Sequence, residues 1–294
     1  MLLRIHHLTE YRYRRPVGLT PHLLRLHPRE TPGLRILASE LFMEPGDASV
    51  RWSLDAEGNA LGKAIFPGET ALLRIRSSLL LEQRQTNPFD FLLETRALTL
   101  PIDYDAREQQ FLAPFLARRD LESDADLSDL ISPFLKGISA RELTLDFLTS
   151  LNRAIPSLFR YVLRHEAGVR SAEETILLRE GTCRDFAHLF IEALRKAGIA
   201  ARYVSGYLCS SPGSPGENHT HGWCEAYLPG AGWRGFDPTN GILAGPHHVP
   251  IAHSIAAGDI PPVEGNYCGE PGLLAGHSVS ISARELFPGE EVAA

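Results

Sequence analysis

The chemistry of this chain centres on a cysteine that stands directly before an amphipathic helix. The segment REGTCRDFAHLFIEALRKAGIAARYVSGYL covers residues 179–208 and contains Cys183. Apolar residues follow the cysteine on one helical face, namely Phe186, Leu189, Phe190, Ala193, Leu194 and Ala197. Cys183 is therefore expected at a helix N-terminus, where unpaired N–H groups and the macrodipole stabilise a thiolate over a thiol. The same N–H groups can hold an oxyanion during acyl transfer.

A histidine and an aspartate follow on a predicted hairpin. Residues 219–241 read HTHGWCEAYLPGAGWRGFDPTNG, which is typical of two strands joined by a glycine-rich turn. With a three-residue loop at 229–231, Asp237 shares a face with His221 at one diagonal step, within reach of an imidazole. A two-residue loop would put the two side chains on opposite faces. Cys183, His221 and Asp237 would then be nucleophile, base and orienting group.

Three further residues are expected near this site. Arg184 adds positive charge beside the cysteine, Trp223 is expected to form a wall of the cleft, and His165 precedes the helix where it can line the cleft. No side chain upstream of Cys183 stands out as an oxyanion donor.

No metal or cofactor site is predicted. Several other histidines could suggest a metal, namely His219, His247, His248 and His253. None of them forms an i,i+4 pair with a carboxylate on a marked helix, and the four cysteines form no CxxC pair. Without a recognisable export signal, the expected location is the reducing cytoplasm, where disulfides are rare.

Composition and periodicity set the class of the protein. The 294 residues carry a formal net charge of -7, which argues against nucleic acid as the main partner. No run of about 18 apolar residues is present, so no membrane span is predicted. Short alternating strands fill residues 2–100 and helical periodicity begins near residue 105. We therefore expect an α+β protein with an N-terminal β-sandwich-like domain at 1–105 and a catalytic domain at 106–294.

Four segments carry motifs that can be compared with a known family. They are GTCRDFAHL at 181–189, ARYVSGY at 201–207, HGWCE at 221–225 and WRGFDPTN at 233–240. Together they resemble the core of the bacterial transglutaminase-like superfamily, whose members are often described as candidate cysteine proteases. The opening segment HHLTEYRYRRPVGL resembles the β domain that precedes this core in bacterial members, and DIPPVEGNYCGEPG resembles their C-terminal strand region. Gly222 is a mild departure from the family, which usually has alanine or a similar small residue after the histidine, and Cys224 stands where a small apolar residue is common.

The resemblance implies a papain-like core, in which the helix bearing Cys183 packs on an antiparallel sheet bearing His221 and Asp237. It implies acyl transfer at amide or peptide bonds of a peptide or protein substrate, through a thioester and without a cofactor. Hydrolysis by a protease or amidase is favoured, because an unregulated crosslinking enzyme would be hazardous in the cytoplasm. A protein-glutamine transglutaminase that uses an amine acceptor, and a binding module without turnover, are the alternatives.

Overall fold

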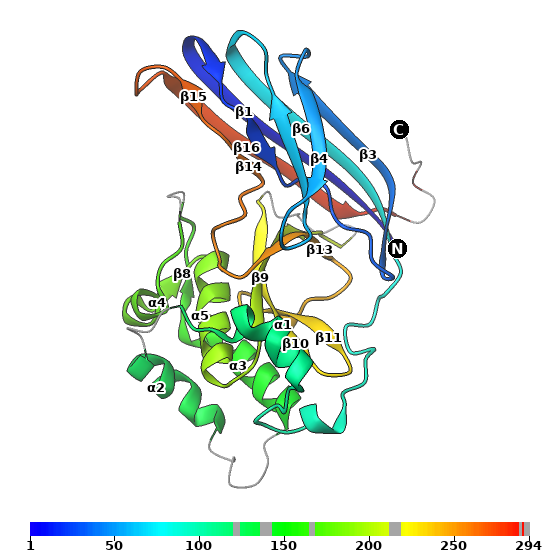
Figure 1. Cartoon of the computed structure of the whole chain (residues 1–294), viewed down its shortest axis with the longest axis vertical. Coiled ribbons are helices and arrows are strands. Elements are labelled where there is room, and N and C mark those ends of the chain that lie inside the picture. Colours follow the sequence, from blue (N-terminus) through cyan, green and yellow to red (C-terminus); the bar gives the residue numbers. More distant parts are fainter. Residues whose placement is uncertain (120–123, 136–142, 165–167, 212–218, 288–289, 291–294) are drawn as a thin grey trace.

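The computed structural model describes residues 1–119, 124–135, 143–164, 168–211, 219–287 and 290. It confirms the predicted α+β class: two antiparallel sheets form one part of the molecule, and helices packed on a third sheet form the other (Figure 1).

The N-terminal part consists of long strands whose inward residues alternate with outward ones. The strands in chain order are β1 Leu2–Leu19, β2 His22–Leu24, β3 Leu34–Glu44, β4 Ser49–Leu54, β5 Ala60–Ile65 and β6 Glu69–Gln83. One sheet has β1 beside β6 and β6 beside β3, and the other has β5 between β2 and β4. Alternation along β6 buries Leu73, Ile75, Leu79 and Leu81, as expected for strands with one face toward a core.

The C-terminal segment returns to these N-terminal sheets. Its strands are β14 Val263–Glu264, β15 Tyr267–Cys268 and β16 Leu274–Glu285. β16 pairs antiparallel with β1 from Leu3↔Glu285 to Tyr13↔Leu274, and β14 pairs with β2. The expectation that residues 106–294 form the second domain is therefore wrong for 263–285, because these strands complete the N-terminal sheets.

The remaining residues form the helical part and its sheet. The helices are α1 Ala106–Leu116, α2 Asp124–Leu135, α3 Thr144–Leu158, α4 Ala172–Leu178 and α5 Cys183–Lys196, with a short 3-10 helix at Thr95–Ala97. The sheet has the order β12-β11-β10-β9-β13, with β9 Ala201–Leu208, β10 His221–Leu228, β11 Gly232–Asp237, β12 Ile242–Leu243 and β13 His248–Ser254. A two-stranded parallel pair, β7 Arg160–Tyr161 and β8 Glu180–Gly181, lies directly before α5. Within the described ranges, no helix is long and apolar enough to cross a membrane.

Helix α5 is the central element of the helical part. It packs on β9 and β10 and lies beside them in Figure 1. Its apolar face, including Phe186, Leu189, Phe190 and Leu194, is fully buried. The helix that presents Cys183 is therefore anchored to the same sheet that carries His221.

The two parts share an apolar cluster. Leu3 and Leu81 from the N-terminal sheet pack in one buried cluster with Tyr207 and Val249 from the sheet under α5. The Tyr207 hydroxyl also lies 2.7 Å from Nδ1 of buried His7 in β1. The sheet that bears the candidate site is thus packed against the N-terminal strands.

Candidate active site

Cys183 is the first residue of α5, as its position in the sequence predicts. Thr182 is the N-cap and Asp185 completes a capping box with it. The Asp185 carboxylate is fully buried and accepts hydrogen bonds from Thr182 N at 2.9 Å and from Arg164 Nη2 at 2.9 Å. A Cβ on Gly181 would lie 2.9 Å from the Phe186 ring, so glycine permits this tight entry. The turn before Cys183 is therefore held by buried polar contacts.

The hairpin has the three-residue loop on which the expected His221–Asp237 contact depends. Leu228 pairs with Gly232, so residues 229–231 form the loop. Nε2 of His221 lies 2.8 Å from Oδ2 of Asp237, and both side chains are buried. The predicted contact is thus present, at a distance typical of a strong hydrogen bond.

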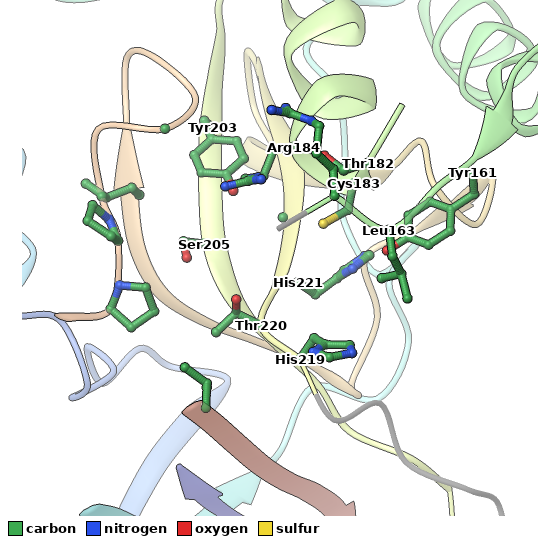
Figure 2. Close-up of a pocket in the computed structure, with 17 residues that line it drawn as sticks. Tyr161, Leu163, Thr182, Cys183, Arg184, Tyr203, Ser205, His219, Thr220 and His221 are labelled. Carbon is green, nitrogen blue, oxygen red and sulfur yellow. The ribbon is translucent and has the colours of Figure 1, made fainter. Parts of the chain in front are cut away.

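His221 faces Cys183 with its other side (Figure 2). Burial alone would lower the pKa of His221, but hydrogen bonds with Asp237 and Cys183 raise it to about 10. The imidazole is therefore protonated at neutral pH.

Asp237 accepts hydrogen bonds on both carboxylate oxygens. Oδ1 accepts from the backbone N of Thr239 at 3.0 Å, and Oδ2 accepts from Asn240 Nδ2 at 2.8 Å as well as from His221. Burial alone would raise the pKa of Asp237, but the hydrogen bonds from His221 and His248 hold it far below its usual range. The carboxylate is therefore ionised although it is fully buried.

His248 is a site neighbour that sequence reasoning weighed only as a metal ligand. Its Nε2 lies 3.0 Å from Oδ2 of Asp237, and its Nδ1 accepts the backbone N–H of Gly245 at 3.1 Å. His221, Asp237 and His248 bring three ligand atoms within 4.8 Å of one another. If His248 bound a metal through Nε2, its proton would have to lie on Nδ1. That proton would then point at the N–H of Gly245, which is itself a donor. This donor set does not fit a metal. The one hint in the sequence is that His248 follows Asp237 by only eleven residues.

A cleft of about 360 Å³ opens beside Cys183. Its described lining includes Tyr203 and Ser205 from β9, Thr220 before β10, and Val279 from the C-terminal strand β16 (Figure 2). Arg184 lines it, as expected. Both the helical part and the returning C-terminal segment therefore shape the entrance.

The expected role of Trp223 as a cleft wall is wrong. Its side chain is only 1% exposed and is not among the residues that line the cleft. Its ring stacks 6.1 Å from the ring of His221 and meets His248 edge-on at 5.3 Å. It packs behind the histidines instead. His165, the other expected cleft residue, lies outside the described residues.

Gly222 leaves room for the Tyr203 side chain. A Cβ on Gly222 would lie 2.4 Å from the Tyr203 hydroxyl oxygen. Burial and the neighbouring Cys183 raise the pKa of Tyr203 above its ordinary value, so the phenol stays protonated. Glycine at this position therefore leaves the space that the tyrosine occupies.

Comparison with known proteins assigns two family matches to the chain. Residues 3–82 match the bacterial transglutaminase-like N-terminal region, and residues 137–238 match the transglutaminase-like superfamily. An uncharacterised protein of Mycobacterium bovis is 29% identical over 276 residues, covering 89% of this chain and 86% of its own length. One of Mycobacterium leprae is 24% identical over 271 residues, covering 91% and 93%.

A solved structure has the same fold. It is that of a candidate cysteine protease from Cytophaga hutchinsonii, with a TM-score of 0.68 and 21% sequence identity. The match covers 96% of this chain and 90% of the other. The likeness therefore includes the N-terminal sheets and the returning C-terminal strand as well as the core.

Proposed function

Since this chain is a member of the transglutaminase-like superfamily with the N-terminal region of its bacterial members, we propose that it is a cysteine-dependent enzyme acting on amide bonds of peptides or proteins. Cys183 is the nucleophile, His221 the acid and base, and Asp237 the orienting group. The observation that carries the proposal is the 2.8 Å contact between His221 and Asp237, on a histidine whose other side meets the cysteine at a helix N-terminus.

The proposed reaction proceeds in two steps. The Cys183 sulfur attacks the amide carbonyl, a C–S bond forms, and the negative charge moves to the carbonyl oxygen, near the N–H groups that begin α5. When the C–N bond breaks, the His221 imidazolium gives its proton to the leaving amine. Water then attacks the thioester while His221 takes its proton, and the acid leaves as the thiolate and the imidazolium are restored.

Water is the acceptor that we propose for the second step. The description of the Cytophaga hutchinsonii structure as a candidate cysteine protease supports this choice. A transglutaminase would use an amine in place of water and form a new amide. We also propose a cytoplasmic location, which cell fractionation with an antibody to this chain would test.

The test of the proposed function is mass spectrometry of a peptide library incubated with the protein, with and without an added primary amine. We expect cleaved or deamidated peptides, and amine adducts in no more than trace amounts. Cys183→Ala should abolish every product. Cys268→Ser is the matched control, because Cys268 is exposed on the distant strand β15. Amine adducts as the main product would assign a transglutaminase, and no product with any peptide would favour a binding module.

A further inference from the structure

His248 is a buried histidine whose two ring nitrogens both have partners. It is 5% exposed and begins strand β13. The backbone N–H of Gly245 donates to its Nδ1 at 3.1 Å, so that nitrogen carries a lone pair and the proton resides on Nε2. Nε2–H therefore donates to Oδ2 of Asp237 at 3.0 Å. The ring acts as a neutral donor directed at the carboxylate.

The oxygen that His248 contacts is the one that orients His221. Oδ2 of Asp237 accepts three hydrogen bonds of 3.0 Å or less. The donors are Nε2 of His221, Nε2 of His248 and Nδ2 of Asn240. These donors approach from β10, β13 and the turn after β11. A carboxylate with donors on several sides cannot rotate without breaking a hydrogen bond in a buried site, which costs far more there than at a surface.

We propose that His248 is a positioning residue, which holds Asp237 in place so that His221 keeps its proton directed at Cys183. The inference rests on the proposed function, because it assigns His248 to the reaction of the same site. His248 does not line the cleft next to Cys183, so it acts through Asp237 rather than on substrate.

The strand arrangement that delivers His248 requires a glycine. β13 pairs with β9 through His248↔Leu208, and β9 pairs with β10 through Gly206↔His221. A Cβ on Gly206 would lie 2.1 Å from the Val249 carbonyl oxygen and 2.7 Å from the Trp223 ring. Glycine at this position lets β13 and Trp223 close against β9, and the Trp223 ring then meets His248 edge-on. The surrounding packing therefore leaves His248 little freedom to turn.

Removal of the His248 donor should change how the site responds to pH. Among the described residues, the titratable and charged groups around His221 and Cys183 are Asp237 on β11, His248 on β13, and Tyr203, Arg184, Arg164 and His219 at the cleft. Asp237 would lose one of the donors that keep it ionised, so it would take up a proton at higher pH. A protonated Asp237 no longer stabilises the imidazolium that faces Cys183.

The test compares two variants of similar size in a Cys268→Ser background. His248→Phe removes the donor, whereas His248→Gln keeps an N–H near the position of Nε2. The rate of alkylation of Cys183 by iodoacetamide is measured across pH by peptide-resolved mass spectrometry, and thermal unfolding checks the fold. We expect the acid limb of the His248→Phe profile to move to higher pH, with kcat falling by about 10-fold to 100-fold and KM little changed. His248→Gln should keep the wild-type profile and most of the activity.

The outcomes separate this proposal from the proposed function. A His248→Phe profile that superimposes on the wild type overturns the inference, as does a folded His248→Gln protein with a shifted profile. If His248→Phe does not fold, His248→Met takes its place as the variant without a donor. Slow alkylation of Cys183 in the wild type, no faster than after denaturation, would instead count against the proposed nucleophile. Alkylation needs no substrate, so it reads out the site even before a substrate is known.

Discussion

Asp237→Asn tests the balance of charge at the centre of the site. Asparagine keeps the shape of the side chain, but it removes the negative charge and replaces one acceptor oxygen by an NH2 group. In the native site both oxygens of Asp237 accept hydrogen bonds. Whichever way the amide turns, its NH2 meets N–H donors, either from the backbone of Thr239 or from His221 and His248. We therefore expect a loss of stability as well as of activity.

The magnitude follows from His221. Its pKa is raised from 6.5 to about 10, and the hydrogen bond with Asp237 is the largest contribution that favours the imidazolium. Removal of one partner of a buried ion pair typically costs about 3–5 kcal/mol. We expect the free energy of unfolding of Asp237→Asn to fall by about 3–5 kcal/mol. The corresponding change in serine-protease triads lowers turnover about 10⁴-fold, and a thiol needs less help to ionise. We expect kcat to fall by about 10²–10³-fold.

Urea unfolding at a series of pH values provides the assay. A folded-state pKa raised to about 10 adds stability that is fully present below pH 6.5 and is lost as the pH rises from 6.5 to 10. This decline should be present in the wild type and smaller in Asp237→Asn, where only the contact with Cys183 remains to raise the pKa of His221. Asp103→Asn is the matched control, because Asp103 is exposed and outside the site. An unchanged decline in Asp237→Asn, or unchanged stability at pH 6, would refute the reasoning.

Three further substitutions test the packing around the site, each by urea unfolding and, once a substrate is known, by kcat. Gly222→Ala should lower stability by about 1–3 kcal/mol, because its Cβ would approach the Tyr203 hydroxyl to 2.4 Å; Tyr203→Phe in the same chain should recover part of this loss, and no recovery would point to a backbone cause. Gly206→Ala should prevent folding, because the Val249 carbonyl at 2.1 Å is backbone and cannot give way; a soluble, folded variant would contradict this. Thr182→Ala should cost about 1 kcal/mol through loss of the N-cap, and an unchanged stability would show that Asp185 alone holds the turn.

The local elements around the site could be predicted from the sequence. The start of α5 at Cys183 follows from a capping residue next to a one-sided apolar pattern, and these interactions involve residues within a few positions of one another. The β10–β11 hairpin is equally local, and its three-residue loop determines which face Asp237 shares with His221. The α+β class follows from the change of periodicity near residue 105.

Contacts between distant segments could not be predicted in this way. Alternation along Leu274–Glu285 indicates a strand but not its partner, and a sequence boundary near residue 105 does not show that this strand pairs with β1. Trp223 alternates like its neighbours, and only the sheet packed behind it shows that its ring is buried. His248 reaches Asp237 although β9 and β10 lie between β13 and β11 in the sheet.

The sequence by itself thus determined the reactive groups and the short elements that carry them: Cys183 on its helix, and His221 and Asp237 on one hairpin. Only the tertiary structure decided what surrounds them, namely the Tyr203 ring over Gly222 and the His248 donor on Asp237. The physical reason is the range of the interactions. Caps, turns and periodicity depend on neighbouring residues, whereas strand order and close packing depend on which distant surfaces meet when the whole chain folds.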